Sequence, residues 1–423
     1  MYLTDRSTPP GADTAQGRRR GLRPKVAPVV LVLGTVSLIT DISSEMVTAV
    51  LPLYLVTTLG FTPLGFGALD GVYNGVSALV QLTGGHLADR VRNHKLMAGL
   101  GYGLSALCKP LLLLAGSLAT LGTVLALERT GKGLRTAPRD AMISLSTPPA
   151  NQGRAFGVHR AMDTTGAMLG PLAAFLILRA AADGYDAVFG VSACVAVFGV
   201  LVLVLFVPGR RQSPQTDEAG AADGKAPIRV REALALLRLP RLRALAGCAA
   251  LLGLTTVSDA FVYLLLQRRA GIGEQWFPLL PLGTAAVFLL LAVPLGTLAD
   301  RVGRRTVFLT GHLGLLAAYA LLLWAPATPA LPYLVLALHG TFYAATDGVL
   351  PAALAGIVPE QLRATGLAIV GTSQALARFC CSLAFGAAWT LWGDGPALAG
   401  SAVGLLCCAA VAGLVLKPTG ATR

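Results

Sequence analysis

Ionisable residues recur inside stretches of the chain that are otherwise apolar, and their spacing is suited to binding and releasing protons. Asp41 and Glu45 are four residues apart, so they share one face of a helix. Arg129, Lys132 and Arg135 recur every three residues and give a second helix a basic stripe. Acids on the first helix that face bases on the second would neutralise each other across a cavity. A proton that binds the carboxylate would break such a pair, because burial and a nearby cation shift the pKa of a carboxyl group in opposite directions.

By this reasoning the proton-binding role belongs to three carboxylates. Arg160 and Asp163 also share a helix face, and charged groups in helices that cross lipid are costly and usually functional. We therefore predict as proton-coupling residues Asp41, Glu45 and Asp163, with Arg129 and Arg160 as their partners. For any one of these residues, a fixed structural ion pair is the competing interpretation.

Other charged residues lie in the middle of apolar segments, and the basic ones allow a second use. Arginine and lysine in a cavity can bind an anionic substrate, such as a phosphorylated or carboxylated metabolite. This alternative to the proton relay stays open. The candidates for lining a substrate cavity are Arg129, Lys132, Arg135, Arg160, Asp259, Asp347 and Arg378, and the mid-depth charges without an assigned role include Asp70, Lys109 and Glu128.

The composition indicates what must position these residues. Only 13% of the 423 residues are charged and 54% are hydrophobic, whereas a soluble domain has about 25% charged residues. The mean hydropathy is +0.67. These values argue against a soluble globule, a disordered chain, a disulfide-rich secreted module and a nucleic-acid-binding protein. The chain is therefore expected to lie in a lipid bilayer.

No sequence pattern indicates a metal site, a cofactor site or a catalytic site. The seven cysteines lie within apolar runs without metal-ligand spacing, and the five histidines are scattered. A Ser-His-Asp set, a metal-binding histidine pair and a phosphate-binding loop are all missing from the sequence. We expect no cofactor and no metal, and we predict that the protein is not an enzyme.

Apolar stretches of the length that crosses a membrane recur along the chain. A helix needs about 20 predominantly apolar residues to span the hydrocarbon. The sequence therefore predicts an all-α integral membrane protein with about twelve transmembrane helices, at residues 27–58, 64–85, 95–116, 119–139, 152–180, 185–207, 242–268, 277–299, 306–325, 331–352, 361–391 and 396–416.

One long polar connection divides these helices into two sets of six. The basic residues are concentrated in the N-terminal tail, in this connection and in the loops on the same side, so the positive-inside rule places both termini in the cytoplasm. The expected location is the inner (plasma) membrane. The predicted organisation is an N-terminal tail at 1–26, an N-terminal bundle at 27–207, a cytoplasmic linker at 208–241, a C-terminal bundle at 242–416 and a tail at 417–423.

The two halves of the chain repeat each other. Asp89-Arg90 after the second predicted helix corresponds to Asp300-Arg301 after the eighth, 211 residues later, and Ser258-Asp259 follows Ser44-Glu45 by 214 residues. Near-equal offsets indicate a duplicated six-helix unit, which is the layout of transporters with two bundles about a central site.

These features resemble the major facilitator superfamily over nearly the whole chain. Its most specific element is a Gly-x-Leu-Ala-Asp-Arg-x-Gly-Arg-Arg loop, which is complete in the second half at Gly296, Asp300, Arg301, Gly303 and Arg304. The first-half copy keeps Gly85, Asp89 and Arg90 but has Arg92 in place of glycine and Asn93 in place of a base. By resemblance, these loops form a cytoplasmic latch that stabilises an outward-open state, with Arg139 as a candidate partner of Asp89. An ordinary positive loop with an ion pair is the alternative.

A second element resembles the proton-antiporting exporter branches of that superfamily. Gly166, Gly170 and Pro171 match a Gly-x-x-x-Gly-Pro element of the fifth helix, and the resemblance places this face against a helix of the other half. Ordinary small-residue packing is the alternative for these three residues. Arg129 and Gly133 match an Arg-x-x-x-Gly element of the fourth helix, with Lys132 in place of a glutamine.

The resemblance implies a monomeric secondary transporter whose two bundles rock about a central site. Its expected partners are the lipid bilayer, protons and a small molecule, with no nucleic acid, and its expected activity is proton-coupled antiport export of a drug or metabolite. The alternative is uptake or exchange of an anionic metabolite that binds the basic stripe of the fourth helix. A sensor or scaffold with a transporter-like fold would show no flux.

Overall fold

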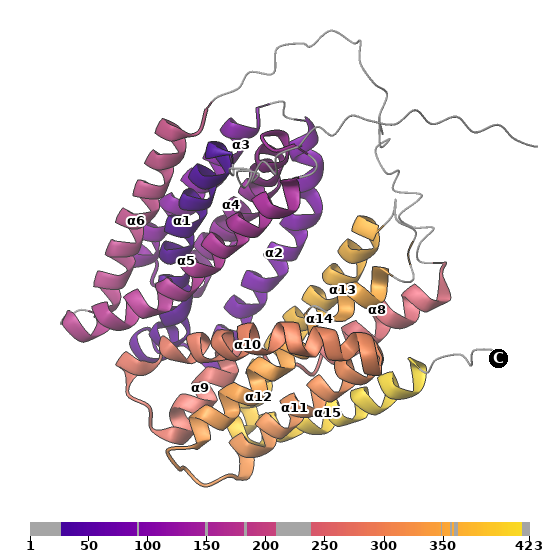
Figure 1. Cartoon of the computed structure of the whole chain (residues 1–423). Helices are drawn as coiled ribbons and strands as arrows, with labels where there is room; N and C mark the ends of the chain where they lie inside the picture. Colours follow the sequence, from indigo (N-terminus) through magenta and orange to yellow (C-terminus); the bar gives the residue numbers. More distant parts are fainter. Residues whose placement is uncertain are drawn as a thin grey trace, which may run out of the picture.

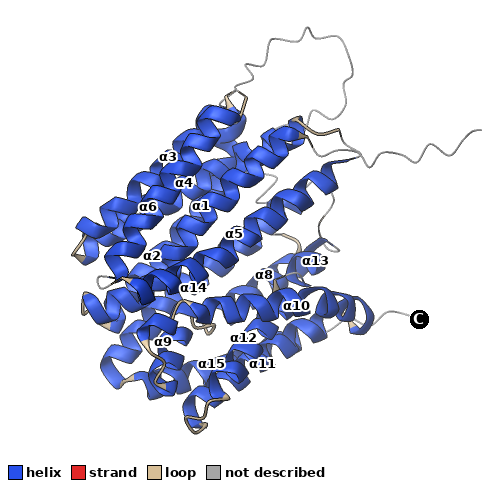
Figure 2. Ribbon diagram, turned by 60° about the vertical axis from the view of Figure 1, so that its left-hand side comes forward, coloured by secondary structure: helices blue, strands red, loops and turns tan. Residues whose placement is uncertain are grey.

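The helices of this protein form two groups that meet along one face. The computed structural model describes residues 27–90, 93–148, 151–181, 184–208, 238–347, 349–355, 358 and 363–416. Within these ranges the chain is helical apart from short connections, and Figures 1 and 2 show the two groups inclined to each other. The predicted all-α fold class is confirmed.

The first group holds the described helices up to Phe206. α1 packs against α5 and α6, α4 lies against α2 and α3, and α3 also contacts α6. The bounds are α1 Pro28–Leu53, continued by a π-helical turn at Tyr54–Thr58, α2 Pro63–Arg90, α3 His94–Leu114, α4 Leu118–Leu145, α5 Gln152–Ala180 and α6 Gly184–Phe206.

The second group begins at Pro240 and packs in the same manner. α12 lies against α10 and α11, while α14 contacts α8 and α15. The bounds are α8 Pro240–Gly253, α9 Asp259–Ala270, a 3-10 turn η3 at Glu274–Trp276, α10 Leu279–Val302, α11 Arg304–Trp324, α12 Leu331–Thr346, α13 Val349–Ala355, α14 Arg363–Trp392 and α15 Asp394–Val415.

Local sequence signals set several of the helix ends. Pro28 and Pro240 begin α1 and α8, at positions where the missing N–H of proline removes no helical hydrogen bond. Ser117 caps α4, because its hydroxyl accepts from the N–H of Thr120 (3.2 Å) and its own N–H donates to Thr120 Oγ1 (3.1 Å). Gly303 adopts a φ of +98° and turns the chain from α10 into α11.

Two of the predicted membrane spans are interrupted rather than continuous. The span at 242–268 is split into α8 and α9, and the span at 331–352 is split at Asp347 into α12 and α13. At the first break the N–H of Val257 donates to the hydroxyl of Tyr319 at 2.8 Å. Such a side-chain partner replaces the helical hydrogen bond that the break removes, as irregular backbone at membrane depth requires.

The helices that could cross a membrane by themselves are the ones without breaks and with few charges. Among the described residues, eight helices pass a test of length and apolar composition, and they contain α1, α3, α5, α6, α10, α11, α14 and α15. α8, α9, α12 and α13 each become long enough only when joined with their partner across the break. α2 and α4 are unbroken and long but do not pass this test.

The glycines of α5 bring this helix close to α1. A Cβ atom at Gly170 would lie 2.7 Å from Glu45 Cβ and 2.9 Å from the carbonyl oxygen of Ile42, and one at Gly166 would lie 3.0 Å from Leu38 Cα. The sequence resemblance placed this face against the other half, and that prediction was wrong for both glycines. Because α1 and α5 belong to one group, this contact holds the first group together.

The close approach of α5 to α1 predicts a position-specific loss of stability. Gly170→Val forces the two helices apart, and overpacking of this kind costs about 1–3 kcal/mol. We expect a lower midpoint of thermal unfolding for the purified protein in detergent. Gly157→Val on the same helix is the matched control, since no atom lies within 4 Å of a Cβ built there. An equal loss in both variants would contradict the role of the contact.

Candidate functional site

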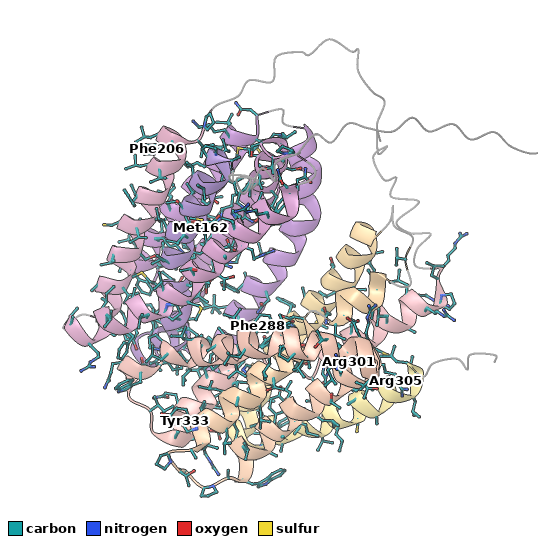
Figure 3. All side chains as sticks on the ribbon, viewed as in Figure 1. Met162, Phe206, Phe288, Arg301, Arg305 and Tyr333 are labelled. Carbon is teal, nitrogen blue, oxygen red and sulfur yellow. The ribbon has the colours of Figure 1, made fainter. Side chains whose placement is uncertain are left out.

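A cavity of about 370 Å³ lies between the two groups of helices. Its wall contains four of the predicted residues, Glu45, Asp259, Asp347 and Arg378, and also Asp70, a charged residue to which the sequence assigned no role. The aromatic part of the wall is formed by Tyr73, Tyr263, Phe277, Phe288 and Tyr343, and Figure 3 marks Phe288 on α10. The cavity therefore has both ionisable and aromatic walls.

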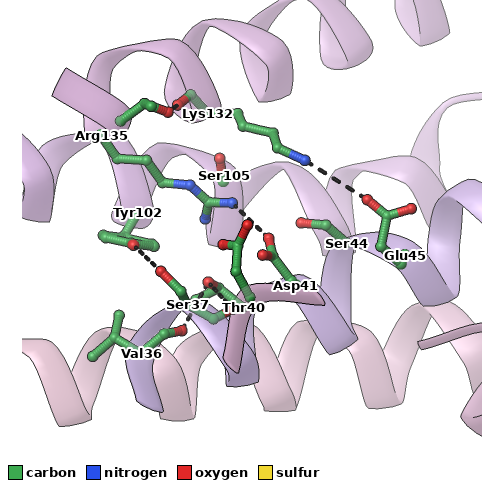
Figure 4. A network of polar contacts seen from close by, with 12 residues as sticks. Val36, Ser37, Thr40, Asp41, Ser44, Glu45, Tyr102, Ser105, Lys132 and Arg135 are labelled. Carbon is green, nitrogen blue, oxygen red and sulfur yellow. Dashed lines mark hydrogen bonds and ion pairs between the residues drawn. The ribbon is translucent and has the colours of Figure 1, made fainter. Parts of the chain in front are cut away.

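Two acids of α1 face two bases of α4 (Figure 4). Arg135 Nη2 lies 3.4 Å from Asp41 Oδ1, and Lys132 Nζ lies 3.7 Å from Glu45 Oε1. The first pair is buried, with side-chain exposures of 4% and 10%, whereas Lys132 and Glu45 are 36% and 26% exposed. Glu45 also lines the cavity, so its pair is the one that solutes can reach.

The predicted partner Arg129 pairs elsewhere. Its Nε lies 2.6 Å from Glu128 Oε2, and its guanidinium stacks 3.9 Å above the ring of Tyr73. Lys109 Nζ reaches the same carboxylate at 3.3 Å, which completes a buried triad between α3 and α4. The reason is rotation about the helix axis: residues six apart are turned by about 120°, so Arg129 and Arg135 leave α4 in different directions.

The third predicted carboxylate, Asp163, lies between two arginines. Arg139 Nη1 is 3.5 Å from Asp163 Oδ1, and Arg160 Nη1 is 3.7 Å from Oδ2. The Arg160 side chain is 78% exposed, so its ion pair contributes little. Arg139 also binds Asp140 at 3.0 Å. The side chain of Asp89, for which Arg139 was the candidate partner, lies outside the described residues.

The second group contributes a carboxylate held by two side chains of α12. Asp259 Oδ1 accepts a hydrogen bond of 2.5 Å from the Tyr343 hydroxyl and lies 3.3 Å from Nε2 of the buried His339. Asp259 is the first residue of α9, where the helix dipole favours negative charge. The sequence did not predict His339 as a partner of Asp259, although its four-residue spacing from Tyr343 on one helix face was an available signal.

The two groups touch at the end of the helices opposite Phe206, which Figure 3 marks. Ser382 Oγ of α14 donates a 2.5 Å hydrogen bond to Asp70 Oδ2 of α2, and the N–H of Leu64 donates to Thr390 Oγ1 at 3.0 Å. A Cβ atom at Gly67 would collide with the carbonyl oxygen of Ser382. Backbones at this contact therefore approach as closely as glycine permits.

Further contacts at the same end join α5 and α6 to the 3-10 turn of the second group. The hydroxyl of Tyr185 donates to Glu274 Oε2 at 3.1 Å, and the rings of Phe175 and Trp276 have centroids 5.0 Å apart. We name this set of contacts, together with those of Gly67, Asp70 and Ser382, the far-end gate. These contacts come from α2, α5, α6 and α14, and they join the two groups at this end.

The loop that carries the predicted latch motif of the second half ends α10 and begins α11. Asp300 and Arg304 form an ion pair of 3.2 Å one helical turn apart, and Arg305 donates a hydrogen bond to the carbonyl oxygen of Gly413 on α15. The motif residues Gly296, Arg301 and Gly303 lie in the same stretch, and Figure 3 marks Arg301. In the first half the backbones of Gly85, Asp89 and Arg90 end α2, but their side chains lie outside the described residues. The latch role stays a prediction.

At the level of sequence, both a family model and individual proteins match a large part of this chain. The family model described as Major Facilitator Superfamily matches residues 33–380 and 280–422. An MFS-type transporter of Methanocaldococcus jannaschii is 31% identical over 389 residues, which covers 89% of this chain and 92% of that protein. A Mycobacterium bovis protein is 32% identical over 208 residues, 49% of this chain and 50% of its own length.

Solved structures share the fold at low sequence identity. The nucleoside transporter NupG superposes with a TM-score of 0.77 at 13% identity, and the match covers 93% of this chain and 100% of that one. A bacterial homologue of the human lysosomal transporter Spinster, in an inward-facing and unoccupied conformation, has a TM-score of 0.72 at 16% identity, with coverage of 92% and 96%. At these identities the likeness concerns the fold alone.

The buried triad on α3 and α4 predicts a large stability loss when its only acid is neutralised. Glu128→Gln leaves Lys109 and Arg129 buried without a counter-charge, and breaking a buried pair in this way costs about 3–5 kcal/mol. Asp140→Asn is the control, because Asp140 is 43% exposed in its pair with Arg139 and such a pair contributes at most about 1 kcal/mol. Thermal unfolding in detergent compares the two; a smaller loss for Glu128→Gln would contradict the assignment.

The far-end gate predicts a conformational effect of a larger residue at Gly67. Gly67→Val should keep α2 away from α14 and shift the protein toward a state in which this end is open. Spin labels at Thr62 and Asp394, in a cysteine-free background, report the separation by double electron–electron resonance. We expect longer distances between the labels in Gly67→Val. The distances should not change in Gly103→Val, because no atom lies within 4 Å of a Cβ built at Gly103. Unchanged distances for Gly67→Val would show that the contact does not close the gate.

Proposed function

Since the chain belongs to the major facilitator superfamily and is thus a multi-pass membrane transporter, we propose that it exports a small molecule in exchange for protons by alternating access. The observation that carries this proposal is the pair between Glu45 and Lys132. It joins two helices of the first group, it lies at the wall of the cavity, and it is partly open to solvent. A proton that neutralises Glu45 releases Lys132 and changes the charge of the cavity wall.

The two α1–α4 pairs differ in how easily a proton breaks them. A partly exposed pair such as Glu45–Lys132 is worth about 0.2–1 kcal/mol, whereas breaking a buried pair such as Asp41–Arg135 costs about 3–5 kcal/mol. Glu45–Lys132 is therefore the pair that can open at little cost to the fold. Opening the Asp41–Arg135 pair requires a rearrangement of α1 against α4, and Asp163 lies further along α5 beside Arg139.

The position of the far-end gate supports an inward-open assignment of this conformer. The gate lies at the end opposite Phe206, the last residue of α6 before the linker. The excess of basic residues in the tail, the linker and the loops at the linker end places that end in the cytoplasm under the positive-inside rule. In this assignment the protein is a monomer in the plasma membrane. Its cavity is closed to the outside and accessible to substrate from the cytoplasm.

The alternative, an anionic metabolite bound by the basic stripe of α4, has less support. Each base of the stripe already has a carboxylate partner: Arg129 has Glu128, Lys132 has Glu45 and Arg135 has Asp41. An anion would have to displace these carboxylates. Arg378 is the base that lines the cavity among the described residues, and it faces several acids there.

Proton coupling is testable before the substrate is known. Everted membrane vesicles are acidified by respiration, and a fluorescent pH probe follows proton efflux when members of a panel of cationic, neutral and anionic compounds are added. We expect at least one compound to release protons through the wild type, and Glu45→Gln to lower that rate at least tenfold.

The controls separate coupling from folding. Asp186→Asn changes an exposed acid at the start of α6 and should retain the wild-type rate. Asp41→Asn should also lose proton release if its pair takes part in the relay. Wild-type proton release in both Glu45→Gln and Asp41→Asn would refute the proposed coupling residues, and no release by any compound of the panel would refute antiport.

A further inference from the structure

We propose that the cavity binds an organic cation with an apolar or aromatic body, and that Asp70, Asp259 and Asp347 form its anionic site. This inference rests on the proposed function, because it names the class of molecule that the transporter exchanges for protons. It depends on three observations: the pairing of charges, the fixed orientation of one carboxylate, and an aromatic wall.

The acids in and beside the cavity fall into two classes according to their partners. Asp41, Glu45, Glu128 and Asp163 in the first group each have an arginine or lysine within 4.0 Å. For Asp70 on α2, and for Asp259 and Asp347 in the second group, the described ion pairs include no arginine or lysine partner. Their nearest cavity base is a single residue, Arg378. Three carboxylates thus face one guanidinium.

An ionised carboxylate away from water is costly without a positive partner. The charged and titratable groups facing this part of the cavity are Glu45, Asp70, Asp259, Asp347 and Arg378, with Lys132 behind Glu45 and His339 behind Asp259. The deficit of positive charge is met either by protons on the carboxyl groups or by a cation between them. Binding of the cation then releases a proton from the carboxyl group that it pairs with, which conserves charge.

The geometry favours one carboxylate as the fixed anchor. Asp259 is held by Tyr343 and His339 through the same oxygen, and 43% of its side chain remains exposed toward the cavity. Its neighbour Ser258 lines the cavity as well. Asp347, at the break between α12 and α13, is exposed to the same space.

The rest of the wall indicates an apolar body for the cation. Tyr263, Phe277, Phe288 and Tyr343 line the cavity beside these acids, and a cation is attracted to the face of an aromatic ring, most strongly where water is excluded. Phosphate-bearing or carboxylate-bearing solutes would instead meet the three acids. The combination of acids and rings therefore selects for quaternary ammonium or phosphonium compounds and protonated aromatic amines.

One of the three acids also belongs to the far-end gate. The 2.5 Å hydrogen bond from Ser382 joins Asp70 to α14 across the two groups. A cation that pairs with Asp70 competes with this hydrogen bond, so occupancy of the cavity acts directly on the contact that keeps this end closed. The cation site and the gate are linked through one side chain.

The test measures binding of tetraphenylphosphonium to the purified full-length protein in detergent by equilibrium dialysis, without a proton gradient. We expect saturable binding, an at least tenfold weaker Kd in Asp70→Asn, Asp259→Asn and Asp347→Asn, and an unchanged Kd in Asp394→Asn, whose acid lies at the start of α15 outside the cavity. Tetraphenylborate, of the same shape and opposite charge, should neither bind saturably nor compete.

A variant that binds more tightly distinguishes an effect on the cation site from a loss of binding caused by misfolding. Arg378→Gln removes the positive charge that faces the three acids, so it should tighten tetraphenylphosphonium binding at least threefold, which a damaged protein cannot do. Unchanged Kd values in all three acid variants, weaker binding in a correctly folded Arg378→Gln, or equal binding of tetraphenylborate would overturn the cation site.

The two proposals fail in different experiments. If vesicles show proton exchange with neutral or anionic solutes and tetraphenylphosphonium does not bind, antiport stands and the cation site falls. If tetraphenylphosphonium binds with the expected pattern of variants but no compound releases protons from vesicles, the cation site stands and proton antiport falls.

Discussion

The structure depends on one constraint, the high free energy of a charged side chain that is removed from water without a partner. In the first group of helices this constraint is met by ion pairs: the triad of Lys109, Glu128 and Arg129 and the pair of Asp41 and Arg135 are buried and complete. Such pairs fix how α3, α4 and α1 are rotated against one another. They hold the first group together behind Glu45, the paired acid that lines the cavity.

Other acids that line the cavity meet the same constraint in another way. Asp259 contacts Tyr343 and His339, and Asp70 accepts a hydrogen bond from Ser382, so these contacts take the place of lysine or arginine partners. Hydrogen bonds hold a carboxylate in place without cancelling its charge. In the proposed mechanism these acids respond to protons and to cations, and Asp70 connects them to the glycine-lined contact between α2 and α14.

Much of the fold was accessible from the sequence because the thickness of a bilayer sets the length of an apolar segment. The helix bounds agree with the predicted spans to within a few residues for α1, α5 and α6. The breaks before Asp259 and at Asp347 were missed. No proline lies in the residues 254–258, and the break there is stabilised by Tyr319 and Cys381, which are remote in sequence. A partner from another helix cannot be read from the local pattern.

For the site, the sequence by itself determined which helices carry charge and that the acids of α1 have bases to face on α4, since these follow from composition and periodicity. Only the tertiary structure decided which base meets which acid, because the rotation of α4 directs Arg129 to Glu128 and leaves Arg135 for Asp41. It also decided that Gly166 and Gly170 face α1, and that Asp70 and Ser382, 312 residues apart, share a hydrogen bond. Contacts between distant segments depend on how helices pack, and packing is a property of the whole chain.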